Sequence, residues 1–166
     1  MGAGKTTIGR LLAKHFARPF VDSDHEIEAR TGVKVPVIFE IEGESGFRQR
    51  ESQVIAELTQ RHGIVLATGG GAVLAENNCQ LLREHGVVVY LHAPLEALLK
   101  RTHKDRNRPL LQTEDPRHTL EEILKAREPI YRQSAAIVID TAHRSPLTVA
   151  REIVKKLEAL PSEIPD

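Results

Sequence analysis

The stretch Met1-Gly2-Ala3-Gly4-Lys5-Thr6-Thr7 decides the fold, because Gly4-Lys5-Thr6 is the second half of the phosphate-binding motif G-x-x-x-x-G-K-[ST]. Glycines in this motif let backbone N–H groups turn toward phosphate oxygens, and the helix that follows adds positive potential. We expect Lys5 to reach the β- and γ-phosphates of ATP and the Thr6 hydroxyl to face Mg²⁺. The predicted ATP-binding residues of this segment are Gly2, Ala3, Gly4, Lys5, Thr6 and Thr7.

The first glycine of the motif, and the strand that normally precedes it, would lie before Met1. We expect the native chain to begin about ten residues earlier, the length of one strand and a short lead-in. Because only half of the motif is present, two other interpretations stay open. One is a flexible glycine-rich helix cap, and the other is a nucleotide-binding module without catalysis.

Composition is that of an ordinary globular protein. The 166 residues suffice for one domain, with 40% hydrophobic and 28% charged residues, and Lys+Arg and Asp+Glu balance at 23 each. A neutral chain does not favour binding to nucleic acid or to a membrane surface. The single cysteine, Cys79, excludes an internal disulfide and fits a reducing compartment. We expect one cytoplasmic domain over residues 1–166, present as a monomer.

Short apolar runs alternate with longer amphipathic stretches, which predicts a parallel α/β sheet covered by helices on both faces. The predicted strands are Pro19–Val21, Ile64–Ala67, Val87–Leu91 and Ala136–Ile139. The predicted helices are Thr6–Phe16, Ser23–Arg30, Glu44–Arg61, Glu76–His85, Leu95–Thr102, Leu120–Arg127 and Leu147–Leu160. Ligands of such sheets bind beyond the carboxyl ends of the strands, so we expect the chemistry there.

Two carboxylates, Asp22 and Asp24, follow the first predicted strand. Ser23 and Glu26 have the spacing of a capping box, so helix capping alone is one explanation. Carboxylates at positions i and i+2 beside a phosphate loop also suit Mg²⁺ and a substrate hydroxyl.

Arg48 and Glu51 extend an otherwise apolar helical stripe that continues through Val54, Ile55 and Leu58. A charged pair on such a face is costly to bury without further partners. A structural ion pair at the edge of the stripe is one interpretation. We favour Arg48 as an anion receptor oriented by Glu51, because a guanidinium binds a carboxylate through two hydrogen bonds.

Three glycines in Thr68-Gly69-Gly70-Gly71 follow the second predicted strand, where they allow a ligand to approach the backbone. A plain loop is the alternative. No acidic residue ends this strand, so the metal-binding role falls to Asp22.

The stretch from about 102 to 116 is polar, basic and without helical periodicity, which is typical of a mobile lid. A solvated loop is the alternative. An arginine on a closing lid, here Arg108, would neutralise charge on the transferred phosphoryl group. Arg127 stands near the end of a predicted helix, where it would also suit the helix dipole.

Together these motifs resemble the shikimate kinase family, most of all its proteobacterial members, over essentially the whole chain. The matching segments are Met1-Gly-Ala-Gly-Lys-Thr-Thr-Ile-Gly-Arg10, Asp22-Ser-Asp24, Glu42-Gly-Glu-Ser-Gly-Phe-Arg48 with Glu51, Thr68-Gly-Gly-Gly71, Arg108-Pro-Leu-Leu111, and Arg127 with Pro129 and Tyr131.

The resemblance implies an α/β three-layer P-loop kinase fold of the nucleoside monophosphate kinase type. Its parallel five-stranded sheet has the order 2-3-1-4-5, and this chain lacks the first strand. The implied reaction is transfer of the γ-phosphate of ATP to the 3-hydroxyl of shikimate, in the pathway to chorismate and the aromatic amino acids. The implied shikimate-binding region is about 23–61 and the implied lid about 102–116.

The resemblance also assigns roles to residues. Asp24 binds the ring hydroxyls and is the candidate base, Asp22 supports Mg²⁺ through water, and Arg108 binds the phosphates from the lid. Arg101 and Pro146 fall where the family sandwiches the adenine. The implied shikimate contacts are Asp24, Arg48, Gly70, Gly71, Arg127, Phe39 and Phe47.

One departure from the family is Val37, where many relatives carry Trp after the proline equivalent to Pro36.

The nearest alternative function is that of another small-molecule kinase of the same fold, such as gluconate kinase. It would share the phosphate loop, but it does not resemble the Phe-Arg-x-x-Glu and Thr-Gly-Gly-Gly segments.

Overall fold

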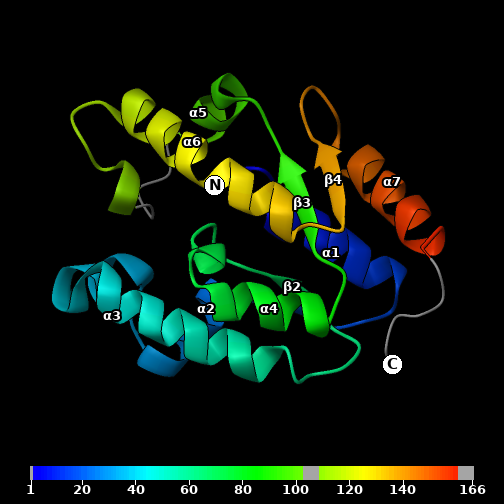
Figure 1. Cartoon of the computed structure of the whole chain (residues 1–166), viewed down its shortest axis with the longest axis horizontal. Helices are drawn as coiled ribbons and strands as arrows, with labels where there is room; N and C mark the ends of the chain where they lie inside the picture. The colour runs from blue at the N-terminus through cyan, green and yellow to red at the C-terminus, as the bar shows by residue number, and fades with distance from the viewer. Residues whose placement is uncertain (1, 103–108, 161–166) are drawn as a thin grey trace.

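The computed structural model describes residues 2–102 and 109–160 (Figure 1). Helices and strands alternate along most of the chain, as the apolar periodicity predicts. The elements are, in chain order, α1 (Lys5–His15), β1 (Phe20–Asp22), α2 (Ser23–Thr31), α3 (Val35–Leu58), β2 (Val65–Ala67), η1 (Ala72–Leu74), α4 (Glu76–Glu84), β3 (Val89–His92), α5 (Leu95–Thr102), η2 (Pro109–Leu111), α6 (Pro116–Ser134), β4 (Ile137–Asp140) and α7 (Pro146–Glu158).

The four strands of the described residues form two parallel pairs. β1 pairs with β2, from Phe20 opposite Val65 to Asp22 opposite Ala67. β3 pairs with β4, from Val89 opposite Ile137 onward. These pairs match neighbours 2-3 and 4-5 of the implied order, and among the described residues its first strand has no counterpart, so one five-stranded sheet does not form.

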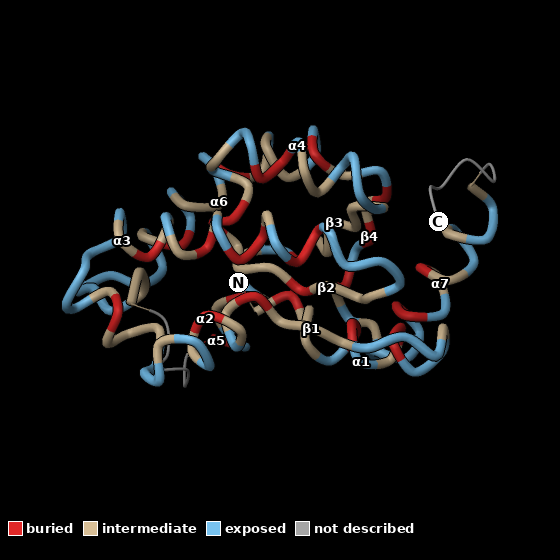
Figure 2. Tube along the Cα trace, turned by 90° about the horizontal axis from the view of Figure 1, so that it is seen from below, coloured by how far each residue is buried: buried red, intermediate tan, exposed pale blue. Residues whose placement is uncertain are grey.

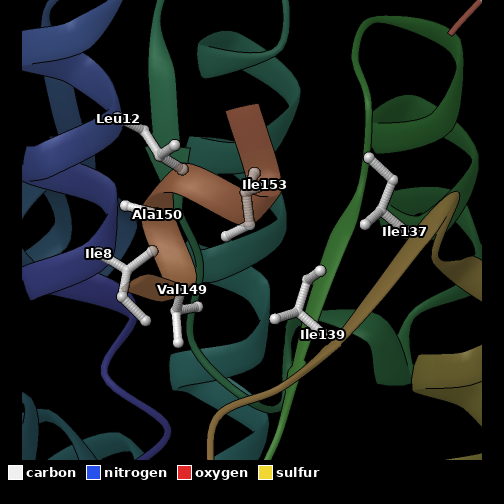
Figure 3. Close-up of a cluster of buried hydrophobic side chains, with 7 residues drawn as sticks. All are labelled: Ile8, Leu12, Ile137, Ile139, Val149, Ala150 and Ile153. Carbon is white, nitrogen blue, oxygen red and sulfur yellow. The ribbon is translucent and has the colours of Figure 1, made fainter. Parts of the chain in front are cut away.

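Three layers are visible in Figure 2, where the strands lie between α4 on one side and α1 on the other. The largest apolar cluster joins α1, α7 and β4 (Figure 3) and contains Ile8, Leu12, Ile137, Ile139, Val149, Ala150 and Ile153. A second cluster joins α2 and α3, and a third joins α5 and α6 to the phosphate-loop residue Ala3.

Two predicted helices are longer in the structure. The helix predicted from Glu44 begins at Val35, because the backbone is helical on both sides of a kink at Gly43, whose φ of 69° lies in the left-handed region. The helix predicted over Leu120–Arg127 spans Pro116–Ser134 and includes Pro129. Arg127 therefore lies inside α6, not at its end.

Candidate active site

The phosphate loop ends at Gly4, the N-cap of α1. Gly4 has a φ of 91°, a left-handed conformation that glycine adopts without steric cost. Its carbonyl accepts the first helical hydrogen bond, from the Ile8 N–H at 2.9 Å. A helix N-terminus directs backbone N–H groups and the positive end of the helix dipole outward, so this end of α1 suits an anion such as a phosphate.

The end of β1 lies directly beside this loop. The Thr6 hydroxyl donates to Oδ2 of Asp22 at 3.2 Å. α1 and β1 approach closely at Gly9, where a Cβ atom would lie 2.5 Å from the Phe20 ring. The two residues predicted to serve Mg²⁺ therefore lie together because these two elements are tightly packed.

The capping box predicted from Ser23 and Glu26 is wrong. The N-cap is Asp22, which has extended backbone angles and accepts a hydrogen bond from the Asp24 N–H at 3.1 Å. Ser23 is buried and already helical, and its hydroxyl accepts from the Gly69 N–H at 3.2 Å. Ser23 thus fastens the start of α2 to the glycine loop.

A hydroxyl and a carboxylate fit Mg²⁺, which keeps several waters and usually takes one or two carboxylates together with substrate phosphates. Within residues 2–102 and 109–160, no group of three or more His, Cys, Asp or Glu side chains is placed to hold a metal by itself. The donor set at Thr6 and Asp22 therefore suits an ion that arrives with a nucleotide.

The Asp24 carboxyl group, near the phosphate loop, has a perturbed pKa. Burial raises its pKa, and the charge of Asp22 raises it further, while Lys5 and Arg48 lower it, with a net increase. Its Oδ1 atom is buried and has no hydrogen-bond partner in the structure. A carboxylate with a raised pKa and an unused acceptor is suited to take a proton from a hydroxyl group.

Arg48 and Glu51 form a close ion pair, with Nη1 of Arg48 2.6 Å from Oε2 of Glu51. Nη2 of Arg48 also lies 3.0 Å from Oε1 of the exposed Glu44. Glu51 is fully buried, and burial raises its pKa more than the charge of Arg48 lowers it. Its other oxygen, Oε1, has no hydrogen-bond partner.

The glycine loop between β2 and η1 lies against these side chains. A Cβ atom at Gly69 would lie 2.6 Å from Oε1 of Glu51 and 2.9 Å from Oδ1 of Asp24, and one at Gly71 would overlap the Arg48 guanidinium. The absence of side chains in the loop therefore brings Asp24, Arg48 and Glu51 against the backbone.

Arg127 and Tyr131 approach the same loop from α6. The Tyr131 hydroxyl donates to the Gly70 carbonyl at 2.5 Å. Burial raises the pKa of Tyr131, and the charges of Arg127 and Arg48 lower it. Arg127 is itself buried. The predicted anion receptor Arg48 thus lies against the glycine loop from α3, while Arg127 acts on Tyr131, which is bonded to that loop from α6.

Arg101, predicted at the adenine site, connects three segments. Its guanidinium donates to the Gly2 carbonyl at 3.3 Å and to the Thr141 carbonyl and hydroxyl at 3.2 and 3.3 Å. Pro146 is exposed at the first turn of α7, where Ser145 is the N-cap. Arg101 therefore joins the phosphate loop to the segment between β4 and α7.

The two predicted aromatic residues lie next to each other on α3, with ring centroids 4.8 Å apart. Phe47 belongs to the buried α2–α3 cluster, and Phe39 packs partly buried against it. The Arg48 guanidinium lies over the Phe47 ring, 5.3 Å from its centre, so a cation–π interaction also holds this arginine.

Arg108 and residues 103–107 of the predicted lid lie outside the described residues. The part of the predicted lid that follows contains the short helix η2.

Sequence reasoning missed the links made by Ser23, Tyr131 and Thr141. The i, i+4 spacing of Arg127 and Tyr131 was the one available signal, since it places both on one face of a helix.

The chain is similar in sequence to a family model and to curated relatives. A family model described as shikimate kinase matches residues 1–158. The shikimate kinase of Bordetella avium (strain 197N) is 60% identical over 159 residues, which are 96% of this chain and 76% of the relative. The shikimate kinase of Thiobacillus denitrificans is 60% identical over 163 residues, 98% of this chain and 89% of the relative.

Solved structures show the same relationship. Shikimate kinase from Acinetobacter baumannii in complex with shikimate superimposes with a TM-score of 0.94 at 50% identity, covering 96% of this chain and 89% of that one. A gluconokinase from Sinorhizobium meliloti has a TM-score of 0.57 at 14% identity, over 96% and 87% of the two chains, which shows a shared fold alone. The predicted P-loop kinase fold class is confirmed. The chain belongs to the shikimate kinase family.

Proposed function

We propose that this chain transfers the γ-phosphate of ATP to the 3-hydroxyl of shikimate, giving shikimate 3-phosphate and ADP. The observation that carries the proposal is the placement of Asp24 and Arg48 against the glycine loop, with Arg127 acting on Tyr131, which is bonded to the same loop. The charge of Lys5 also acts on Asp24. This placement supports a carboxylate receptor and a proton acceptor next to the place where a nucleotide phosphate would bind. A hydroxy acid such as shikimate needs both.

Arg48 and Arg127 would hold the substrate carboxylate. The ion pair with Glu51 fixes the Arg48 side chain, so its guanidinium loses little conformational entropy when it binds an anion. Two positive groups from separate helices also set the position of the ring relative to Asp24. Gly70 and Gly71 would contact the substrate through their backbone, and Phe39 and Phe47 would border it.

Asp24 would orient the 3-hydroxyl and take its proton. The charge of Lys5 acts on Asp24, which supports a short distance between the phosphate loop and the acceptor site. Lys5 would stabilise the charge on the transferred phosphoryl group, and Arg108 would do so from the lid.

Thr6 and Asp22 would hold Mg²⁺, Thr6 directly and Asp22 through water. The ion, when bound, neutralises charge shared by the β- and γ-phosphates. Their hydrogen bond in the structure supports this pairing, because it places hydroxyl and carboxylate oxygens at one spot beside α1. Arg101 and Pro146 would flank the adenine.

The direct test is a coupled ADP-release assay with shikimate, gluconate and a nucleoside monophosphate as acceptors. We expect turnover with shikimate and little with the other two, because only shikimate presents both a carboxylate and a suitably placed hydroxyl. Faster turnover with gluconate than with shikimate would contradict the assignment.

The remaining expectations are a monomer located in the cytoplasm, acting without nucleic acid or membrane partners. In the part of the chain that the structure describes, no helix combines the length and the apolar character needed to cross a bilayer. Size-exclusion chromatography with light scattering tests the monomer.

A further inference from the structure

Tyr131 sits where the two halves of the acceptor site meet. Its hydroxyl donates to the Gly70 carbonyl, a hydrogen bond of 2.5 Å that joins α6 to a loop 61 residues earlier in the chain. Burial raises the pKa of this hydroxyl, and the positive charge of Arg127, one helical turn away on α6, acts on it and lowers that pKa. One oxygen atom is thus bonded to the glycine loop and interacts electrostatically with a predicted carboxylate receptor.

The hydrogen bond fixes the orientation of a peptide group. The described residues contain no cis peptide bond, so the Gly70–Gly71 peptide is trans and planar. In a trans peptide the carbonyl and the following N–H point in opposite directions. Because the Gly70 carbonyl points to Tyr131, the Gly71 N–H points away from that hydroxyl. Glycines rotate easily, so without this bond the peptide would sample other orientations.

The interaction of Tyr131 with Arg127 restrains the second receptor. Arg127 and Tyr131 are four residues apart on α6 and therefore share a face of the helix, although Pro129 lies between them. Arg127 is 7% exposed, so its side chain has few other conformations in which the guanidinium would reach solvent.

The Tyr131 ring is held independently of its hydroxyl. It packs against the Tyr90 ring, with centroids 5.0 Å apart and planes inclined by 31°. Removal of the hydroxyl oxygen alone should therefore leave the ring in place. Tyr90 offers a matched position, because it lines a cavity of about 310 Å³ with His92 and Glu128, and no glycine of the loop lines that cavity.

We propose that Tyr131 is a positioning residue of the acceptor site, which orients the Gly70–Gly71 peptide and the Arg127 guanidinium toward the substrate. This inference rests on the proposed function and extends it, since it makes Tyr131 a determinant of affinity for the hydroxy acid. ATP binds at the other loop and does not depend on it.

The test compares Tyr131→Phe with Tyr90→Phe, which remove the same atom from two stacked rings. We expect the KM for shikimate to rise about 3- to 30-fold in Tyr131→Phe, the effect of one hydrogen bond near charged groups. The KM for ATP should stay at the wild-type value, and Tyr90→Phe should behave as wild type. An unchanged KM for shikimate, or an equal rise for ATP, overturns the proposal.

A second measurement does not depend on turnover. The amide resonance of Gly71 in a ¹H–¹⁵N spectrum should shift in Tyr131→Phe and stay in place in Tyr90→Phe. An unchanged Gly71 resonance overturns the orienting role even if the KM changes. If wild type phosphorylates gluconate in place of shikimate, the proposed function fails, while the Gly71 resonance still decides whether Tyr131 orients the loop.

Discussion

Arg48 is held from the side of the protein core by Glu51, whose Oε2 atom lies 2.6 Å from Nη1 of the arginine. The Glu51 side chain is 1% exposed and that of Arg48 is 22% exposed. The acid is thus a fixed internal support, and the guanidinium reaches from it toward the glycine loop. A surface ion pair would hold the arginine far less firmly, because both side chains would remain free to move.

Replacement of Arg48 by lysine should weaken shikimate binding by about 1.5–3 kcal/mol, because lysine keeps the charge but cannot bind a carboxylate through two parallel hydrogen bonds. Lysine is preferable to alanine, which would leave Glu51 buried without a partner. Arg50→Lys is the control, since Arg50 pairs with Glu42 at the surface of the same helix. Calorimetric titration with shikimate checks both; equal affinities for Arg48→Lys and Arg50→Lys would return Arg48 to a structural role.

A methyl group at Gly71 should displace Arg48, because the added Cβ would overlap its guanidinium. We expect Gly71→Ala to raise the KM for shikimate about tenfold or more, the equivalent of about 1.4 kcal/mol, with little change for ATP. Gly86→Ala is the matched control, since its Cβ would meet nothing closer than 3.8 Å. A Gly71→Ala enzyme with wild-type kinetics would show that Arg48 does not need this loop.

Asp24→Asn and Asp22→Asn should fail in different ways. Asp24→Asn should lower kcat by about 10²–10⁴-fold, the usual contribution of a general base, with the KM for ATP largely kept. Asp22→Asn should require more Mg²⁺ for half-maximal activity, because a neutral amide attracts the ion less. Activity measured against Mg²⁺ concentration separates the two variants. Superimposable curves for wild type and Asp22→Asn would refute the division of roles.

Glu51 should make stability depend on pH. Burial raises its pKa above the ordinary value of 4.5, so the folded state keeps the proton at pH values where the unfolded chain has lost it. The stability of wild type relative to Glu51→Gln should therefore be highest below about pH 4.5 and fall as the pH rises through the folded pKa. Urea unfolding at several pH values measures this; Gln49→Ala, at an exposed and uncharged position, is the control. A stability difference between wild type and Glu51→Gln that does not change with pH would contradict this prediction.

The cluster between α1, α7 and β4 should carry much of the stability (Figure 3). Ile153 is completely buried there, so Ile153→Ala should lower the free energy of unfolding by about 2–5 kcal/mol. Leu147→Ala, on the same helix but 48% exposed, should cost much less. Denaturant unfolding of the two variants provides the comparison, and equal losses would show that the cluster is not the core.

Features encoded by local pattern could be predicted from the sequence. Apolar periodicity gives the four strands to within one or two residues, and α5 is predicted over the bounds that it has, Leu95–Thr102. Motif spacing gives the phosphate loop and the fold class. The residues predicted for the acceptor site lie after β1, on α3, after β2 and on α6. Those after β1 and β2 lie as expected where parallel strands end at one edge.

Features that depend on distant contacts could not be predicted. Asp22 and Ser23 are both good helix caps by composition, and only the bond from Ser23 to Gly69, 46 residues later, explains why Asp22 takes the position. The bond from Tyr131 to Gly70 likewise exists only after folding. The early start of α3 was missed because Gly43 interrupts the pattern while the backbone is helical on both sides of it.

The close packing of Gly9 against Phe20 would affect ion selectivity at the proposed metal site of Thr6 and Asp22. This contact sets how near α1 stands to β1, and so how near Thr6 stands to Asp22. Mg²⁺ binds oxygen atoms at about 2.0–2.1 Å in a strict octahedron, whereas Ca²⁺ takes them at about 2.3–2.6 Å in looser geometries. A side chain at Gly9 would push the helix outward and favour the larger ion. Gly9, which binds no ligand itself, would then determine the size of the ion that the site prefers.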